Sequence, residues 1–240
     1  MTATEVTSLL ADGELKVHGR IVNASNHTTL VQVGGGDAVL AVYKPRAGER
    51  PLWDFPLGTL HRREVAAFVV SAFLGWDIVP PTLLREGPLG LGSVQLFIDH
   101  DPQRHYFVLV EEAAHDEQLA RMAVFDLLIN NADRKASHVL LDAGAHIWGC
   151  DHGLTFHPQA KLRTVIWEFG GVPLHEQWSA DLGRLAAALE DRHSAVRGDL
   201  ASLLSGAEVA MLARRAALLG AADALPDIDE DLRPYPWPPL

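Results

Sequence analysis

The chain has 240 residues, 48% of them hydrophobic, so it can bury a sizeable core as one large domain or as two lobes. Its 31 acidic residues outnumber 20 basic ones, and the net charge of −11 disfavours nucleic acid and anionic membranes as partners, because both bind concentrated basic surfaces. Cys150 is the only cysteine, and no signal peptide or bilayer-length apolar run is found, which predicts a cytoplasmic protein without a stable membrane anchor.

The N-terminal segments alternate like β-strands, and a lysine lies near the end of one of them. Residues 38–46, AVLAVYKPR, carry Lys44 at a position that a buried strand does not favour. Lys44 is therefore either a phosphate-binding amine or a strand-end lysine whose charged head reaches solvent. The preceding loop contains Ser25 and Asn26, whose polar groups fit phosphate binding or a simple hairpin turn.

A helix is predicted over residues 61–75, where apolar residues recur at intervals of three and four. Glu64 lies at the edge of the apolar face of this helix. In kinase-like folds a glutamate on such a helix pairs with a strand lysine and aims it at the α and β phosphates. Alternatively, Glu64 is a first-turn acid that complements the helix dipole.

Two irregular segments separate the predicted elements. Residues 47–60 contain two prolines and two glycines, so no regular structure is expected there. Trp53 and Phe55 make this segment either a flap over a site or a packed surface loop, and we favour the packed loop. Residues 100–107 form a polar connector to a second half that is mostly helical.

The second half places two acidic loops around a predicted hairpin. Residues 118–131 are apolar on nearly every side, which predicts a central helix that delivers Asp133 from its C-terminal end. Asp126 within this helix is expected to be a buried, hydrogen-bonded acid. Two short apolar runs around a glycine-containing turn follow, and they should bring Asp133 and Asp151 to one mouth. Each acidic loop alone is a weak signal, because aspartate is common in turns.

Two carboxylates in this arrangement fit phosphoryl transfer. The reaction needs the acceptor hydroxyl held in line and a divalent metal against the phosphate oxygens, with little covalent help from the protein. Asp133 is placed to take or orient the hydroxyl proton, and Asp151 is placed to bind magnesium, which prefers oxygen ligands.

Five segments together resemble the phosphatidylinositol 3- and 4-kinase superfamily, most of all its type II 4-kinase branch, over roughly residues 15–170. They are VYKPR, HRREVAAFVVSAFLGWDIVPPT, GSVQLFI, NNADRKASHVLL and CDHGLTF. The chain also resembles an actinobacterial group related to these kinases, a likeness that indicates a fold but no substrate. The resemblance implies an α+β, two-lobed, protein-kinase-like (lipid-kinase-like) fold. Residues 1–98 would form an N-lobe with an antiparallel sheet and one helix, and residues 99–240 a mostly helical C-lobe.

The resemblance also implies roles for individual residues. Lys44 would bind the α and β phosphates with Glu64 as its partner, and Asp133, followed by Arg134, would be the catalytic carboxylate. Asp151 would be the principal metal ligand. The remaining nucleotide contacts would come from Ser25 and Asn26 in the phosphate loop and from Gln95, Phe97 and Ile98 at the hinge. The implied cofactors are ATP and magnesium, with manganese as a second possibility.

One position departs from the family pattern. Five residues after the catalytic aspartate the family usually has an asparagine that helps to bind the metal, whereas this chain has His138. Imidazole is a poor ligand for magnesium and a better one for zinc or manganese. His138 could bind metal in this way, contact a phosphate oxygen, or mark a slow or inactive enzyme.

The sequence therefore predicts an ATP- and metal-dependent phosphotransferase whose acceptor is an alcohol on a lipid, a small metabolite or a protein. The alternatives are a nucleotide-binding pseudokinase with a regulatory role, and a protein kinase or nucleotidyl transferase. Only Lys161 and Arg163 add positive charge just after the metal loop, which disfavours a multiply phosphorylated inositol lipid. Three C-terminal helices follow, the last opened by a capping box of Ser205 and Glu208. The proline-rich tail is either a strap on the body or a partner-binding end.

Overall fold

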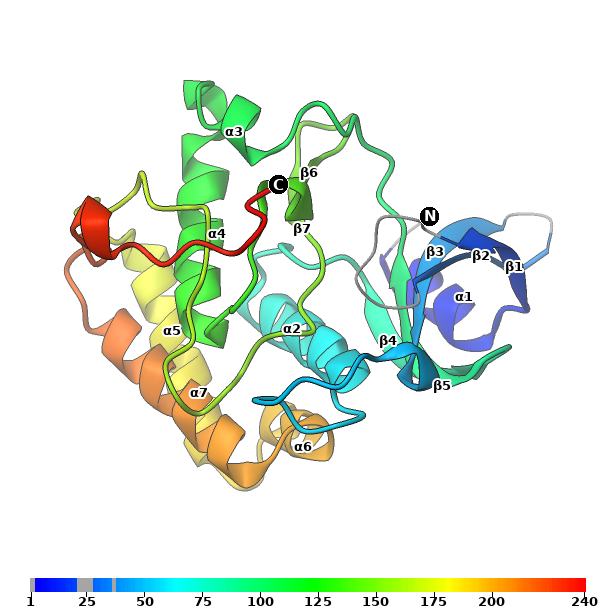
Figure 1. Cartoon of the computed structure of the whole chain (residues 1–240). Coiled ribbons are helices and arrows are strands. Elements are labelled where there is room, and N and C mark those ends of the chain that lie inside the picture. Colours follow the sequence, from blue (N-terminus) through cyan, green and yellow to red (C-terminus); the bar gives the residue numbers. More distant parts are fainter. Residues whose placement is uncertain (1–2, 21–27, 36–37) are drawn as a thin grey trace.

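The computed structural model describes residues 3–20, 28–35 and 38–240. A small sheet lobe and a larger, mostly helical lobe lie side by side, joined by extended segments (Figure 1). This architecture confirms the predicted α+β class. In the described part of the chain, no helix is long and apolar enough to cross a membrane.

The small lobe is built on a five-stranded sheet in which every neighbouring pair is antiparallel, in the order β1-β2-β3-β5-β4. Its elements are α1 (Ala3–Asp12), β1 (Leu15–Arg20), β2 (Thr29–Val33), β3 (Val39–Pro45), β4 (Thr82–Gly87) and β5 (Gly90–Leu96). Alternate residues of β2 and β3 are buried, as the period of a strand requires, and they pack with α1 in a separate small core. Helix α1 was not predicted from the sequence.

The approach of β5 to β3 depends on a glycine beside the strand lysine. Lys44 pairs with Ser93, and Pro45 pairs with Gly92. A Cβ atom on Gly92 would lie 2.5 Å from the carbonyl oxygen of Lys44, so only glycine allows this pairing.

Helix α2 (Leu60–Leu74) joins the larger lobe through its packing. Its buried residues Ala66, Ala67, Val70 and Leu74 belong to the same core as α4 and the C-terminal helices. The helix ends at Gly75, whose φ of 71° is the left-handed conformation that favours glycine in a helix cap.

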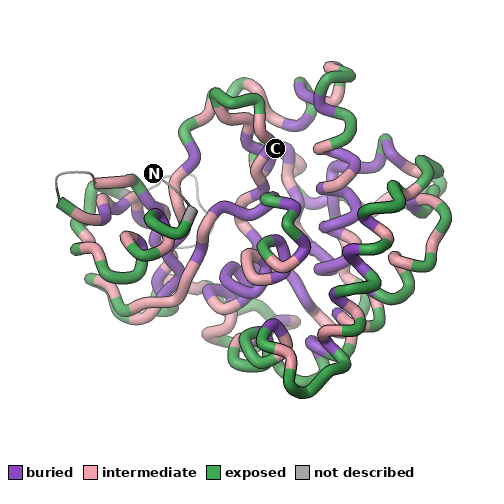
Figure 2. Tube along the Cα trace, turned by 180° about the vertical axis from the view of Figure 1, so that it is seen from behind, coloured by how far each residue is buried: buried purple, intermediate pink, exposed green. Residues whose placement is uncertain are grey.

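The larger lobe surrounds a central helix. Its elements are α3 (Tyr106–Leu109), α4 (Asp116–Ile129), β6 (Val139–Leu141), β7 (Ile147–Gly149), α5 (Glu176–Glu190), α6 (Ala195–Leu203) and α7 (Gly206–Gly220), with short 3₁₀ turns at Arg46–Gly48, Ala113–His115, Ala136–His138 and Glu230–Leu232. Helix α4 is buried on most sides, and Figure 2 shows buried positions gathered in the middle of this lobe with exposed ones on the outer helices. The predicted hairpin is β6 paired with β7, and the three predicted C-terminal helices are α5, α6 and α7.

A buried ion pair ties α2 to α7. The guanidinium of Arg63, 1% exposed, donates to the carboxylate of Glu208 and to the carbonyl oxygen of Thr155. Glu208 also completes the predicted capping box with Ser205. Because a buried charge is costly without its partner, this pair holds α2 in one position against the larger lobe.

Candidate active site

The amine of Lys44, on β3, joins two carboxylates that come from distant parts of the chain. Its Nζ lies 2.5 Å from Oε1 of Glu64, on α2, and 2.8 Å from Oδ1 of Asp151, which follows β7. Burial acts to lower the pKa of Lys44, but the charges of Asp151 and Glu64 outweigh it and hold this pKa above its ordinary value. Lys44 is therefore charged in the site at neutral pH.

The two carboxylates differ in their surroundings. Burial raises the pKa of Glu64 despite the lysine, whereas the Lys44 charge outweighs burial at Asp151 and keeps its pKa below the ordinary range. The second oxygen of Glu64 accepts a hydrogen bond of 2.9 Å from the amide of His152, so Glu64 also fixes the loop that carries Asp151. Asp151 has a φ of 57°, a rare conformation for a residue with a side chain, and such strain is concentrated at functional sites.

Asp133 lies beyond the end of α4, which is capped by Asn130 in the left-handed conformation with a φ of 53°. The amide of Asp133 donates to Oδ1 of Asn131 at 3.0 Å, and its carboxylate lies 3.6 Å from Nζ of Lys135. Burial raises the pKa of Asp133 to about 6, and Lys135 only partly opposes this effect. A carboxylate with this pKa is suited to take a proton near neutral pH.

Arg134 points away from these groups. Its side chain is fully buried and lies 2.9 Å from Asp126, 2.9 Å from the carbonyl oxygen of Cys150 and 2.7 Å from Nε2 of His152. Asp126 is the buried, hydrogen-bonded acid that the sequence predicts. Arg134 therefore connects the loops of Asp133 and Asp151, and its buried side chain lines neither of the two cavities around Lys44.

His138 faces Asp151 from the other side. Burial lowers the pKa of His138 to about 4, so the ring is neutral at physiological pH. Its Nδ1 lies 3.0 Å from the carbonyl oxygen of Asp133 and 3.4 Å from the amide of Lys135, and the shorter contact requires the ring proton on Nδ1. Nε2 then carries the free lone pair, and it lies 3.5 Å from Oδ2 of Asp151. Two electron-rich atoms that face each other in this way suit a divalent cation.

The described residues by themselves supply few metal ligands. Over residues 3–20, 28–35 and 38–240, no three His, Cys, Asp or Glu side chains converge to hold a metal ion. A cation would therefore depend on Asp151, His138 and oxygens of a ligand, which is the usual arrangement where metal binds together with phosphate.

Two adjoining cavities open around Lys44. The phosphate cavity, of about 510 Å³, is lined by Lys44, Glu64, Asp133, Lys135, Asp151 and Arg163 among others. The hinge cavity, of about 490 Å³, is lined by Val42, Gln95, Phe97, Ile98, His138 and Leu140 among others. Lys44, Lys135 and Asp151 line both, so the predicted hinge residues and carboxylates border one continuous space. The predicted phosphate-loop residues Ser25 and Asn26 lie outside the described residues.

Several residues that line the phosphate cavity were not singled out in the sequence analysis, among them Glu49, His61 and Lys135. His61 and Glu49 line it as a pair, with Nδ1 of the ring 2.6 Å from the carboxylate. Nε2 of His61 is buried and, among the described residues, has no hydrogen-bond partner. Lys135 could have been found from its position two residues after Asp133, but the contact between Glu49 and His61 spans an irregular segment and has no local signal.

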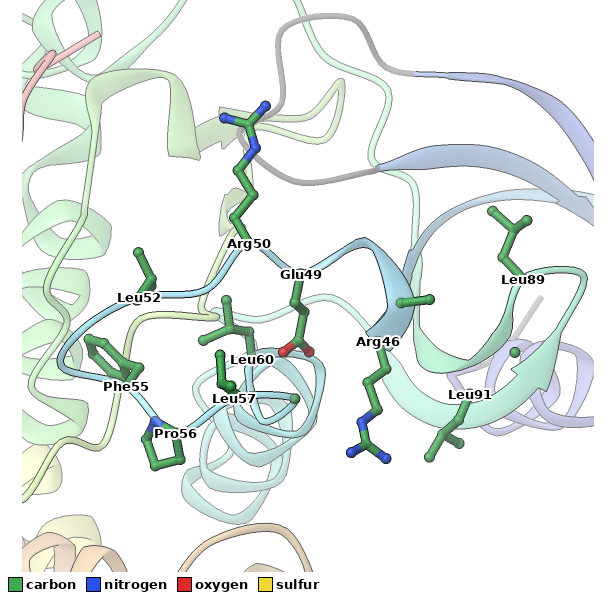
Figure 3. Close-up of a pocket in the computed structure, with 13 residues that line it drawn as sticks. Arg46, Glu49, Arg50, Leu52, Phe55, Pro56, Leu57, Leu60, Leu89 and Leu91 are labelled. Atoms are coloured by element: carbon green, nitrogen blue, oxygen red, sulfur yellow. The ribbon is translucent and has the colours of Figure 1, made fainter.

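The irregular segment 47–60 is a wall between cavities. Phe55 is buried, 6% exposed, as the favoured packed loop requires, whereas Trp53 is 91% exposed and lies at the surface. A further cavity of about 490 Å³ opens beside it, toward the turn of β4 and β5, and contains none of the predicted site residues (Figure 3). Arg46 and Arg50 point in opposite directions there, so no concentrated cationic site forms.

Comparison with known structures defines the class of the fold. The chain has a TM-score of 0.58 to the Golgi casein kinase with Mn and ADP bound, at 14% identity, covering 96% of this chain and 80% of that one. It has a TM-score of 0.57 to hydra Fam20 with sugar, at 16% identity, covering 90% and 86%. The chain therefore has a kinase-like fold, as predicted. Neither comparison indicates the type II phosphatidylinositol 4-kinase branch, which stays a prediction.

Sequence comparison defines the family. No family model matches the chain. It is 42% identical to protein Rv2133c of Mycobacterium tuberculosis (strain ATCC 25618 / H37Rv) over an alignment of 269 positions, covering 96% of this chain and 94% of that protein. The chain belongs to the family of Rv2133c.

Proposed function

We propose that the chain is an ATP- and metal-dependent phosphotransferase that acts on an alcohol. The observation that carries this proposal is the meeting of Lys44, Glu64, Asp133 and Asp151, from four separate segments, around one cavity. Phosphoryl transfer depends on positioning and on charge stabilisation, and these groups supply both.

Each residue has a defined task in this proposal. ATP with a divalent cation, when bound, supplies the phosphoryl group. Lys44 donates to phosphate oxygens, and Glu64 keeps its amine in the cavity. Asp133 orients the acceptor hydroxyl and takes its proton, which its pKa of about 6 allows at neutral pH. Gln95, Phe97 and Ile98 would border the base in the hinge cavity.

Asp151 and His138 would hold the cation. An imidazole nitrogen beside a carboxylate favours manganese over magnesium, because magnesium prefers oxygen ligands. We expect His138→Asn to shift the metal preference of nucleotide binding from manganese toward magnesium. Equal preference in wild type and variant, measured by titration calorimetry, would place His138 outside the metal site.

The acceptor is proposed only as a class. The resemblance to phosphatidylinositol 3- and 4-kinases supports the hydroxyl of an inositol lipid, and a small metabolite or a protein side chain also fits the open phosphate cavity. Among the described residues, Lys135, Arg163 and Arg50 are the cations that line this cavity beside Lys44. A neutral or singly charged acceptor suits this small number of positive charges in the cavity better than a multiply phosphorylated acceptor does.

The test is an unbiased search for the phosphorylated product. Protein, lipid and metabolite pools are incubated with γ-labelled ATP and magnesium or manganese and analysed by mass spectrometry. Wild type should label one class of molecule, and Asp133→Ala should lose this label while still binding nucleotide. Asp199→Asn, which changes an exposed carboxylate on α6, is the matched control and should keep full transfer. Transfer by Asp133→Ala at the wild-type rate would refute the assignment.

A non-catalytic nucleotide-binding protein is the second candidate. It is favoured by His138 at the position of the family asparagine and by the small number of metal ligands among the described residues. A thermal shift with ATP, combined with no label on any pool under either metal, would support this candidate. The loss of metal-dependent nucleotide binding in Asp151→Asn is expected under both candidates, and its retention would contradict both.

A further inference from the structure

The end of the chain lies across the catalytic loop. Residues 234–240 contain four prolines and run as an extended segment toward the hairpin of β6 and β7 (Figure 1). Two backbone hydrogen bonds fix it: the amide of Thr164 donates to Pro234 at 3.2 Å, and the amide of Ala136 donates to Pro239 at 2.8 Å. Ala136 lies between Asp133 and His138, so the tail is attached directly to the loop that carries both.

This tail forms part of both cavities. Tyr235, Pro236 and Trp237 line the phosphate cavity, and Pro238 and Leu240 line the hinge cavity together with Gln95, Phe97 and Ile98. With the tail in place the two cavities still measure about 510 and 490 Å³. The tail therefore borders the space and leaves it open.

We propose that residues 234–240 are a wall of the nucleotide site, in which Pro238 and Leu240 contact the bound nucleotide and the docked tail raises nucleotide affinity. This inference rests on the proposed nucleotide binding and goes beyond it, since it assigns binding residues that lie outside every predicted motif. Nucleotide binding and tail docking then stabilise each other, because coupling between two binding events is reciprocal.

The chemistry of the tail suits this role. Prolines restrict the unbound conformations of the segment, so docking costs less conformational entropy than it would for a flexible chain. Leu240 is 58% exposed, and a ligand in the hinge cavity can cover part of this apolar surface. The interaction of Pro239 with Ala136 needs only backbone atoms, so it survives changes in the neighbouring side chains.

The test measures the dissociation constant of a non-hydrolysable ATP analogue in the presence of manganese. Removal of residues 234–240 should weaken binding by roughly tenfold and Leu240→Ala by roughly threefold, as expected for lost apolar contacts at a binding site. Leu232→Ala is the matched control, because Leu232 is 73% exposed and lines neither cavity. It should bind like wild type.

A second measurement uses the intact chain. Hydrogen exchange at the amide of Ala136 reports tail docking, and the analogue should slow this exchange severalfold. If the truncated chain does not fold, the affinity of Leu240→Ala and the exchange rate of the Ala136 amide test the proposal instead. The inference would be overturned if the truncated chain bound the analogue as tightly as wild type or more tightly, or if the analogue left the exchange rate of the Ala136 amide unchanged. Either result would leave the proposed nucleotide binding intact. Failure of the wild type to bind any nucleotide would instead overturn the proposed function, and this inference with it.

Discussion

Asp133→Asn should make the folded protein more stable at neutral pH while it abolishes transfer. The carboxylate is held in a site where burial raises its pKa from 3.8 to about 6, so the folded state resists its ionisation. The protonated carboxyl is favoured in the folded state, so it contributes stability that is fully present below pH 3.8. This stability is lost as the pH rises through about 6. Asparagine has no charge to bury, so the variant keeps its free energy of unfolding as the pH rises.

The size of the effect follows from the shift. A change from 3.8 to about 6 corresponds to about 3 kcal/mol, and this value is an upper limit because Asp133 keeps about a quarter of its side chain exposed. We expect the variant to match wild type near pH 4 and to gain up to about 3 kcal/mol near pH 8, which for a chain of this length raises the melting temperature by up to roughly 10 °C.

The assay is urea unfolding between pH 4 and pH 8, in EDTA and without nucleotide, so that no ligand contributes. Asp126→Asn is the contrasting control: its carboxylate is buried against Arg134, and its loss should lower stability by about 3–5 kcal/mol. Equal stability of wild type and Asp133→Asn at every pH would refute the assignment of a buried, destabilised carboxylate to position 133.

Three further predictions concern the same framework. The transfer rate should rise with pH through about 6, because Asp133 must be ionised to take a proton, and a flat profile from pH 5 to 8 would argue against this role. Arg63→Met should lower the free energy of unfolding by about 3–5 kcal/mol, since it leaves the Glu208 carboxylate without its buried partner; a loss below about 1 kcal/mol in urea unfolding would contradict this. Burial raises the pKa of the Cys150 thiol to about 12, so iodoacetamide at pH 8 should modify the native chain far more slowly than the unfolded chain, and equal rates by mass spectrometry would contradict this raised pKa.

The local pattern of the sequence was sufficient to predict most helices and strands, and it singled out several of the residues that line the cavity. Helix α4, the hairpin of β6 and β7 and the capping box of Ser205 and Glu208 follow from hydrophobic periods and turn residues that act over a few positions. Lys44, Glu64 and Asp151 could be related to one another because their order and spacing resemble those of kinases. Their contacts of 2.5 and 2.8 Å agree with that expectation.

Only the tertiary structure decided which side chains reach the cavity. Arg134 follows Asp133 directly in the sequence, yet its guanidinium is fully buried in an ion pair with Asp126. Glu49 pairs with His61, and the tail is attached to Ala136; in each contact at least one partner lies in an irregular segment without a periodic signal. Such contacts depend on how distant parts of the chain pack and satisfy buried polar groups, and no local window of sequence contains that information.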